Sequence, residues 1–504
     1  MTESRTKNSI RNMGTGIVVQ VINIIMEFVV RTVFIQMLNA EYLGVNGLFA
    51  NILTMLSFAE LGIGTAIIFN MYKPVAENDQ KKIKALMNLY KKAYNIIGIV
   101  IFVLGLCVIP FMGLIIKDAP NISENLIFIY ILFLINTSSS YFFIYKRSII
   151  AAHQKQSVLN NIDSIFYIIR SIVEIIFLVI TKNFAVFLII KIVATISENI
   201  IVSHKADKMY PYLKNNNEKL DKKETKGIFA NVRSLIVYKF GSVIMDGTDN
   251  ILISSMINVE TVGFCSNYTL LIGSVKNVIN SALKGVTASI GNLNAVESKE
   301  IKERVFYQLT FINYIIYSFC TIAFIVLLTP FIKIWLGGKY TLSLLVVISL
   351  AVSFFITGLR NPGYTYRVTM GLFRKGKITP YIGAISNIIF SIVLCHFIGL
   401  AGIFIATSIS QLLSYSWIDP YLIHKYEFKT SVFKYFKKFV IYFASFSAIA
   451  LLTYVICDLI AIKGILGFVI KCFVVLLIPN ILNLLLFMRT DEFKQTKRML
   501  KNIH

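Results

Sequence analysis

The sequence has little charge and none of the short motifs that mark common enzyme sites. Only 15% of its 504 residues are charged, against roughly 25% in soluble domains. It contains no HExxH, GxSxG or P-loop sequence, and its five histidines are scattered. These absences argue against a zinc protease, a serine hydrolase and a nucleotide-dependent enzyme. We therefore expect a protein that is not an enzyme and that carries no cofactor or metal.

Cysteine is also scarce, and its spacing excludes familiar cysteine-based sites. The six cysteines show no CxxC spacing, and all of them fall inside or beside apolar stretches. This placement is typical of small buried apolar residues rather than of disulfides or zinc ligands.

Apolar residues dominate what is present. They make up 56% of the chain, and the mean hydropathy is +0.71, values that indicate an all-α polytopic membrane protein. With about 20 residues per crossing, we predict about fourteen transmembrane helices. The predicted spans lie near residues 14–38, 45–72, 93–116, 124–145, 157–180, 184–204, 230–257, 262–284, 306–330, 341–371, 378–396, 400–423, 439–460 and 465–488.

The net charge of +24 is spread along the chain in a way that predicts orientation. Alternate loops, beginning with the N-terminal segment, hold more than thirty Lys and Arg residues, whereas the intervening loops hold five. Such alternation is typical of cytoplasmic loops and not of a nucleic-acid-binding surface. We therefore expect both termini in the cytoplasm and no nucleic acid as a partner. The outer loops are all short, which leaves no room for an extracellular domain.

A Lys-rich polar loop near residues 205–229 divides the predicted spans, and a weak repeat relates the two sides. At an offset of 219 residues, the segment 38–52 aligns with 257–271, so that Asn39 matches Asn258 and Gly44 matches Gly263. We expect two parallel six-helix lobes, residues 1–226 and 227–430, followed by a helix pair and cytoplasmic tail in 431–504. Parallel six-span lobes around a site near the membrane midplane are a transporter plan.

Nine basic residues lie within the predicted spans. Arg233, Arg367 and Lys471 are close to span ends, where we expect them to reach the headgroups. A cation at the bilayer centre costs roughly 2.5 to 3.5 kcal/mol even on a lenient scale, so the deeper ones should face a cavity or the interior of the helix bundle. This deeper set comprises Arg31, Arg170, Lys191, Lys239, Lys276 and Arg360.

Acidic residues accompany several of these cations, and two readings of them stay open. Glu27 with Arg31, and Arg170 with Glu174, have the i, i+4 spacing of pairs that neutralise each other. Alternatively these residues line a cavity, and the acids serve charge pairing or coupling. Because Lys276 and Arg360 have no acid within one turn, an anionic ligand is favoured, and a mixed set of Arg and Lys suits phosphate or pyrophosphate. The acids in question are Glu27, Glu60, Glu174, Asp246 and Asp249.

Span ten contains Pro362 between glycines, in "ITGLRNPGYTYRVTMG". Proline removes a helical donor and clashes with the preceding turn. We therefore expect a kink or a short unwinding near Pro362. Broken helices in transporters tend to flank the substrate path, although Pro is also common in ordinary membrane helices.

Three elements near the N-terminus carry a family resemblance: "YLGVNGLF", "LSFAELGIGTAI" and "YKPVAEND". Over about sixty residues they resemble the Wzx-type polysaccharide (O-antigen or capsule) repeat-unit flippases. These belong to the multidrug/oligosaccharidyl-lipid/polysaccharide (MOP) superfamily, and the fourteen-span plan fits along the whole chain. The resemblance implies two six-helix lobes around a cavity and places Arg31 as a first-helix arginine that meets pyrophosphate. Glu60 matches an acid of the second motif, with no role implied.

The resemblance further implies a function in the bacterial cytoplasmic membrane. That function is the transfer of undecaprenyl-pyrophosphate-linked oligosaccharide to the outer leaflet by alternating access, for surface polysaccharide assembly. Implied partners are this lipid-linked glycan, membrane lipids, a glycan polymerase and glycosyltransferases. Two alternatives stay open: a cation-coupled multidrug exporter of the same superfamily, and a membrane glycan polymerase or ligase.

Overall fold

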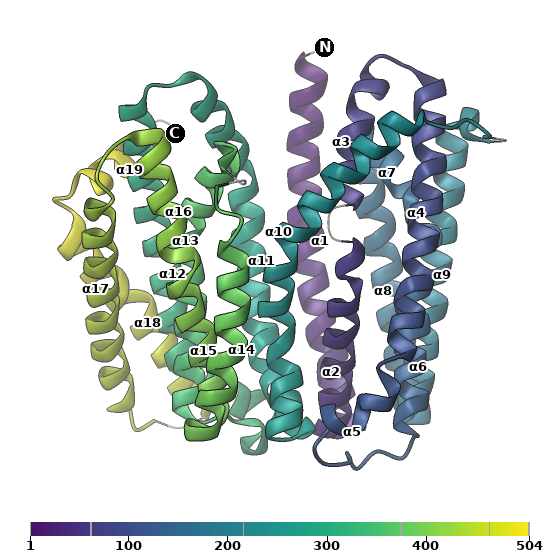
Figure 1. Ribbon diagram of the computed structural model, residues 1–504. Helices are drawn as coiled ribbons and strands as arrows, with labels where there is room; N and C mark the ends of the chain where they lie inside the picture. The colour runs from purple at the N-terminus through teal and green to yellow at the C-terminus, as the bar shows by residue number, and fades with distance from the viewer. Residues whose placement is uncertain (1, 61–62, 215, 373–374, 463, 502–504) are drawn as a thin grey trace. The chain divides into compact units, whose positions relative to one another are not determined.

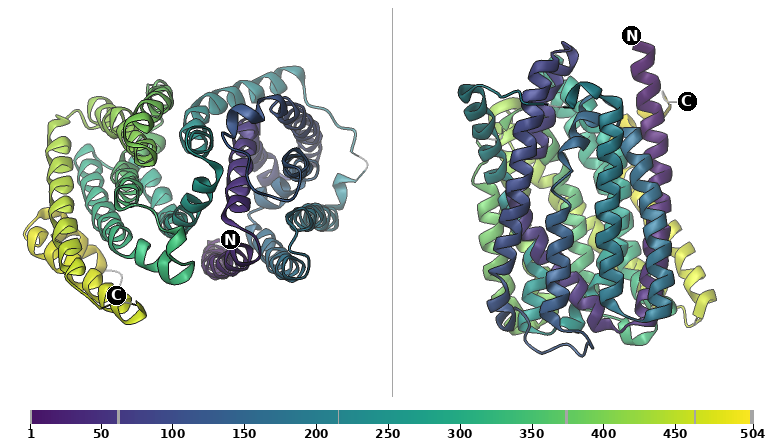
Figure 2. Two further views of the ribbon diagram at one scale, coloured as in Figure 1. Left: turned by 90° about the horizontal axis from the view of Figure 1, so that it is seen from below. Right: turned by 90° about the vertical axis from the view of Figure 1, so that its right-hand side faces the viewer.

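The computed structural model describes residues 2–60, 63–214, 216–372, 375–462 and 464–501, and every regular element in these ranges is helical. The chain divides into two compact units, residues 1–263 and 264–504. Within each unit the long helices run roughly parallel to one another (Figures 1 and 2). The lobe boundaries predicted above, after residues 226 and 430, are not tested by this division and stay predictions.

In unit 1 most of the main helix contacts join helices that are distant along the chain. α1 packs along α8, α8 along α9, α6 along α9, and α10 against α2. Its elements are α1 (Thr2–Met37), α2 (Ala40–Leu56), η1 (Ser57–Glu60), α3 (Ile63–Ala76), α4 (Gln80–Leu106), η2 (Ile109–Phe111), α5 (Met112–Ile115), α6 (Leu126–Ser139), α7 (Tyr145–Ala152), α8 (Gln156–Thr181), α9 (Phe184–Met209), η3 (Pro211–Leu213) and α10 (Lys222–Met256).

Unit 2 is built around α12, which packs against α13, α17 and α18, while α14 packs against α15. Helix α11 begins at the end of unit 1 and continues into unit 2. The elements are α11 (Val259–Val296), α12 (Lys299–Trp335), η4 (Gly338–Tyr340), α13 (Leu344–Thr369), α14 (Thr379–Ile398), α15 (Leu400–Leu413), α16 (Tyr415–Ile423), the π-helical turn η6 (His424–Phe428), α17 (Phe433–Asp458), α18 (Gly464–Phe487) and α19 (Asp491–Lys501).

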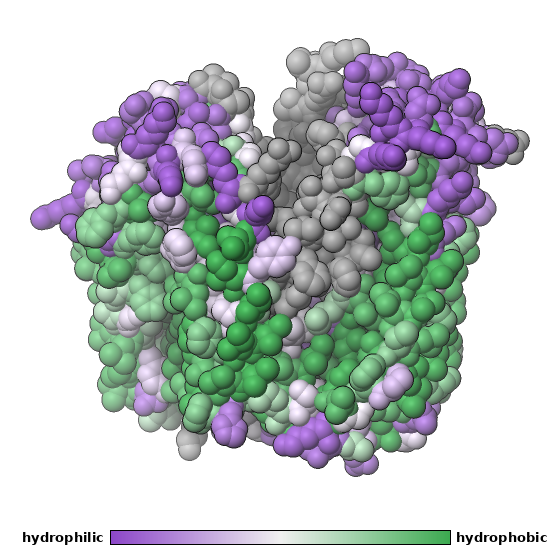
Figure 3. All heavy atoms as spheres, viewed as in Figure 1, coloured by the Kyte–Doolittle hydropathy of each residue, from purple (hydrophilic) through white to green (hydrophobic). Residues whose placement is uncertain are grey.

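The helices have the length and composition of a multi-pass membrane protein. Within the described residues, ten helical segments are long and apolar enough to cross a bilayer. Hydrophobic residues cover the middle of each unit and hydrophilic residues gather at its two ends (Figure 3). The predicted all-α membrane fold is therefore confirmed. The count of fourteen stays a prediction, because the ten segments found among the described residues correspond to predicted spans other than the second, fourth, seventh and eighth.

The two segments of the predicted repeat have the same local structure. Asn39 caps α2 by accepting backbone N–H hydrogen bonds at 2.9 and 3.1 Å, and Asn258, just before α11, accepts one from Thr261 at 2.8 Å. Gly44 and Gly263 lie at a close backbone contact between the two segments. A Cβ on Gly44 would lie 1.9 Å from the Val259 carbonyl oxygen, and a Cβ on Gly263 would lie 2.3 Å from that of Ala40. The repeat is thus a matched pair of capped helix starts that pack through glycine.

Helix continuity differs from the sequence-based expectation at Pro362. α13 is one helix from Leu344 to Thr369, so the chain does not unwind near Pro362; the alternative, a kink, stays a prediction. Because proline has no backbone N–H, one carbonyl in the preceding turn loses its helical hydrogen bond. α12 and α16 pack against α13, and such neighbouring helices allow a membrane helix to continue through a proline. In unit 1 the second predicted span is divided between α2 and α3. The short helix η1, which ends at Glu60, lies between them.

Candidate functional site

A polar pocket of about 170 Å³ lies among the helices of unit 1. Three cations and two carboxylates line it, which gives a formal charge of +1. They come from α1, α8 and α9, and α2 adds Leu43 and Asn46. The five charged residues are Glu27, Arg31, Arg170, Glu174 and Lys191. Residues predicted separately from three different spans thus share one pocket.

Helical spacing explains why α8 presents a polar face here. Tyr167, Arg170, Ser171 and Glu174 follow one another at i, i+3, i+4 and i+7, and all four line the pocket. This spacing places side chains on one face of a helix. Other residues along this part of α8 are apolar, and exposed ones such as Ile169 and Ile176 are suited to lipid.

On α1 the same spacing produces a mixed face. Glu27, Val30, Arg31 and Phe34 all line the pocket. The Phe34 ring lies edge-on to those of Phe184 and Phe187 on α9, with centroid distances of 5.6 and 5.4 Å. This aromatic contact fixes α1 against α9 beside the charges.

The pocket cations are held by contacts of several kinds. The Nε of Arg170 lies 3.5 Å from a carboxylate oxygen of Glu174, and its guanidinium lies over the Tyr167 ring at 5.0 Å. The ammonium of Lys191 lies 5.8 Å from the centroid of Phe133. The contact with Glu174 uses one donor of Arg170, so other donors of Arg170 and the ammonium of Lys191 can reach an anion.

The other predicted site residues lie elsewhere or outside the described side chains. Glu60 accepts a hydrogen bond from the Tyr141 hydroxyl at 2.8 Å. Arg360 lies over the ring of Tyr415 at 4.4 Å. Lys276, the other predicted unit 2 cation without a nearby acid, is half-buried on α11. Asp249 is half-buried on α10, whereas the side chains of Lys239, Asp246 and Arg233 lie outside the described residues.

Arg367 corrects an expectation. Its position near a span end predicted that it would reach the headgroups, yet its side chain is 0% exposed and its Nη1 lies 2.8 Å from Asp419, itself 1% exposed. α16 packs against α13 and brings the carboxylate to the arginine. Lys471, assigned the same behaviour, lines an apolar-walled pocket beside Asp458.

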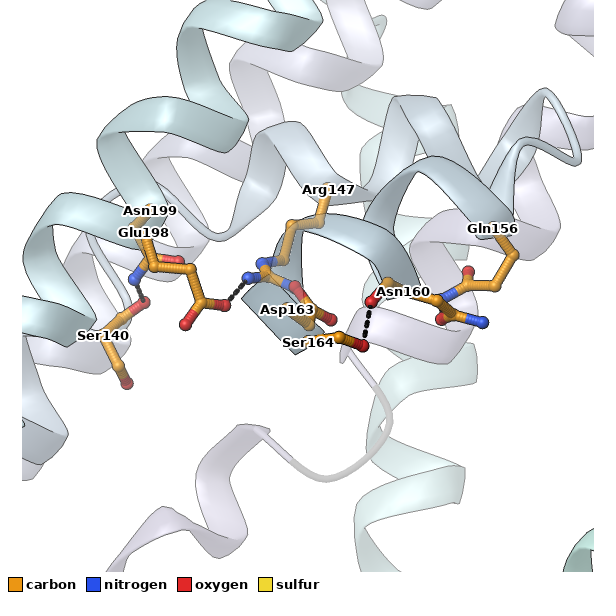
Figure 4. A network of polar contacts seen from close by, with 8 residues as sticks. All are labelled: Ser140, Arg147, Gln156, Asn160, Asp163, Ser164, Glu198 and Asn199. Carbon is orange, nitrogen blue, oxygen red and sulfur yellow. Dashed lines mark hydrogen bonds and ion pairs between the residues drawn. The ribbon is translucent and has the colours of Figure 1, made fainter. Parts of the chain in front are cut away.

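An ion network that the sequence did not reveal joins three helices of unit 1 (Figure 4). Arg147 on α7 donates to Asp163 on α8 at 2.8 Å and also to Glu198 on α9. Lys146 pairs with Asp207 at 2.6 Å. These contacts connect α7, α8 and α9, and α8 and α9 carry most of the pocket charges.

Hydrogen bonds also join α2, α6 and α9 at the opposite ends of these helices. Glu124 accepts from the Tyr42 hydroxyl at 2.6 Å and from the Phe184 N–H at 2.9 Å. Burial opposes ionisation of Glu124, but the hydrogen bonds from Tyr42, Phe184 and Ser123 outweigh it and lower the pKa of this carboxyl. α9 is thus held at its start by Glu124 and further along by the contacts of Glu198 and Asp207.

Comparison with known sequences identifies a family match in the region that holds this pocket. The model of a family described as "Polysaccharide biosynthesis protein" matches residues 9–288. That range includes all five charged residues of the pocket. No curated protein sequence matches the chain.

Solved structures with the same fold are transporters and a flippase. An inward-facing MATE family multidrug resistance transporter of the MOP superfamily has a TM-score of 0.64 at 14% identity, covering 78% of this chain and 93% of that one. Lipid II flippase MurJ, in an inward closed conformation, has a TM-score of 0.63 at 16% identity, covering 94% and 98%. An outward-facing MATE family transporter has a TM-score of 0.54 at 14% identity, covering 81% and 93%. These likenesses establish that the chain has the same fold as these proteins.

Proposed function

The chain belongs to the polysaccharide biosynthesis protein family, and we propose that it is a flippase for undecaprenyl-pyrophosphate-linked oligosaccharide repeat units. It would carry them across the bacterial cytoplasmic membrane by alternating access, with both termini in the cytoplasm. Family membership and the MOP superfamily fold support transport in polysaccharide assembly. A glycan polymerase and glycosyltransferases are the proposed partners.

The observation that carries the proposal is the charged pocket of unit 1. Three cations at membrane depth are costly unless they bind something anionic or are fully paired. Among the described residues that line the pocket, two carboxylates accompany these three cations. Arginine provides a planar fork for phosphate oxygens and lysine a mobile charge, which together suit pyrophosphate.

The size of the pocket supports the proposal that it binds the head of the substrate. Its volume of about 170 Å³ lies below the roughly 300–1,000 Å³ of pockets that enclose drug-sized ligands. We assign it to the pyrophosphate, with the glycan outside it and the polyprenyl tail in lipid. Arg31, Arg170 and Lys191 bind the head, and Glu27 and Glu174 hold the cations when no substrate is bound.

The remaining predicted residues keep subordinate roles in the proposal. Lys276 and Arg360 of unit 2 and Lys239 are further candidates for contact with the anionic head. Glu60, Asp246 and Asp249 are candidates for charge pairing or coupling. Glu60 has a defined partner, the Tyr141 hydroxyl, at the break between α2 and α3, where a change in helix geometry would move it.

A cation-coupled multidrug exporter is the second candidate, favoured by the likeness to MATE family transporters. In that case Glu27 and Glu174 would bind the cationic ligand. The pocket's excess of positive charge opposes this assignment, because a cation entering it would meet three like charges. A glycan polymerase or ligase has no support from these comparisons.

The test uses cells in which this chain is the only flippase for the glycan. The amount of lipid-linked repeat unit in the outer leaflet is measured with a membrane-impermeant glycan-binding reagent on spheroplasts. Lys191→Ala and Arg31→Ala should reduce outer-leaflet exposure by about tenfold or more, since hydrogen bonds to charged groups contribute roughly 1.5–3 kcal/mol. Lys205→Ala is the matched control, because Lys205 is an exposed lysine on the same helix as Lys191.

Protein amount in the membrane is measured for every variant. Normal exposure of the glycan in pocket variants present at the wild-type amount would refute the proposal. Loss of drug efflux with normal glycan exposure would instead favour the multidrug exporter.

A further inference from the structure

Unit 2 contains a second pocket with a different chemical character. Its volume is about 300 Å³, and α11, α12 and α13 line it. Its lining includes three asparagines, Asn280, Asn313 and Asn361, together with Tyr364 and Thr365. Among the described residues that line it, none is charged, in contrast to the five charges of the unit 1 pocket.

The charged residues of α13 do not line this pocket. Arg360 lies over the Tyr415 ring, and Arg367 pairs with Asp419 at 2.8 Å. Among the described lining residues, an anionic head would therefore find no opposite charge, and a cationic ligand no carboxylate. The pocket is suited to a neutral polar ligand.

The asparagine side chains define what that ligand must offer. Each carboxamide presents two donors and one acceptor oxygen, the combination that matches hydroxyl groups, which both donate and accept. Asn313 is 2% exposed, and its amide donates to the Leu309 carbonyl at 3.0 Å. Its Oδ1 has no hydrogen-bond partner in the described structure. A buried amide oxygen without a partner is destabilising by about 1–3 kcal/mol, a cost that a ligand hydroxyl would remove.

Tyr364 adds an aromatic surface at the pocket. Its side chain is 42% exposed, so it remains accessible to a ligand. An aromatic ring with a polar tip offers apolar contact area together with a hydrogen-bonding group. Sugar rings combine an apolar C–H face with hydroxyl groups at the edge, and they match both parts of this lining.

We propose that the unit 2 pocket is a sugar-binding site that takes one sugar ring of the lipid-linked glycan. The inference rests on the proposed flippase function and assigns a separate part of the substrate to each of the two pockets. The charged pocket of unit 1 binds the pyrophosphate, and the neutral pocket of unit 2 recognises carbohydrate. Its volume lies at the lower end of the ligand-pocket range, which suits a single ring rather than a whole repeat unit.

The experiment compares two lipids on the purified full-length protein in nanodiscs. One is undecaprenyl pyrophosphate, and the other is the undecaprenyl-pyrophosphate-linked repeat unit extracted from producing cells. Asn361→Ala and Tyr364→Ala should weaken binding of the glycan-linked lipid about fivefold each, the effect expected from one typical hydrogen bond or ring contact. Binding of undecaprenyl pyrophosphate should not change.

Matched variants separate binding from folding. Asn480→Ala replaces an exposed asparagine on α18 of the same unit and should leave both affinities unchanged. Asn361→Gln keeps the amide and should recover part of the lost affinity. Equal affinities of Asn361→Ala, Tyr364→Ala and wild type for the glycan-linked lipid would overturn the inference and leave the flippase proposal intact. Binding of neither lipid by the wild-type protein would overturn both proposals.

Discussion

The contact between the two repeated helix starts gives a sharp prediction about stability. Gly44 lies so close to the backbone of the second segment that a Cβ would be 1.9 Å from the Val259 carbonyl oxygen and 2.8 Å from its carbonyl carbon. No rotamer change relieves a clash with backbone, so the helices themselves must separate. Inserting extra atoms into a packed contact costs typically about 1–3 kcal/mol, and here the shift required is large.

Gly47, one turn later on the same helix, provides the matched control. A Cβ at Gly47 would lie 3.5 Å from a methyl group of Val262 and 3.7 Å from the Asn250 amide, which are ordinary contacts. Helix propensity favours Ala over Gly by about 0.8–1.0 kcal/mol. Gly47→Ala should therefore be neutral or slightly stabilising. Gly44→Ala should be destabilising, because the backbone clash exceeds the gain in propensity.

The assay is thermal unfolding of the purified protein in detergent, followed as the fraction that remains monodisperse after heating. Gly44→Ala is expected to unfold at a clearly lower temperature than wild type, and Gly47→Ala at the same or a higher temperature. Indistinguishable unfolding of the two variants would refute the reasoning, since only the backbone approach at Gly44 separates them.

Three further predictions concern the ionic contacts. Arg367→Ala should lower the free energy of unfolding by about 3–5 kcal/mol, because it leaves the carboxylate of Asp419 buried without its partner. The double variant Arg367→Met/Asp419→Leu should recover most of that loss in the same heating assay. Arg147→Ala should cost about 1–2 kcal/mol, since one partly exposed guanidinium bridges two carboxylates (Figure 4). An unfolding temperature of Arg147→Ala equal to that of wild type would contradict the bridging role. Glu124 has a lowered pKa, so its stabilising effect is present above the ordinary carboxyl pKa and is lost as the pH falls through the lowered value. In Glu124→Gln the free energy of unfolding should therefore fall less steeply as the pH is lowered. An unchanged fall at acid pH would contradict this.

The unit 1 pocket could be predicted from the sequence because its charges repeat at helical spacing. Glu27 and Arg31, and Arg170 and Glu174, lie four residues apart, and helix geometry alone places each pair on one face. Tyr167 and Ser171 belong to the same pattern on α8 and could have been included on that basis. That the faces of α1, α8 and α9 meet is a tertiary fact, which spacing within one helix does not contain.

The contacts that were missed or mistaken join distant parts of the chain. Arg147 is 16 residues from one carboxylate partner and 51 residues from the other, and the three lie on different helices. Arg367 is near the end of an apolar run, which predicted a surface position, yet its partner Asp419 arrives from α16. The distance of a residue from the end of an apolar run predicts its depth in the membrane. Its burial depends instead on which other helices surround its side chain.

The affinity of the purified protein for undecaprenyl pyrophosphate, compared with its affinity for undecaprenol, tests the central claim most directly. The two lipids share the tail and differ only in the charged head that Arg31, Arg170 and Lys191 are proposed to bind. The account predicts that wild type prefers the pyrophosphate by at least tenfold. It also predicts that the triple variant Arg31→Ala/Arg170→Ala/Lys191→Ala loses this preference while Lys205→Ala keeps it. Equal affinity of the wild-type protein for both lipids, or a preference that survives in a folded triple variant, would contradict the claim.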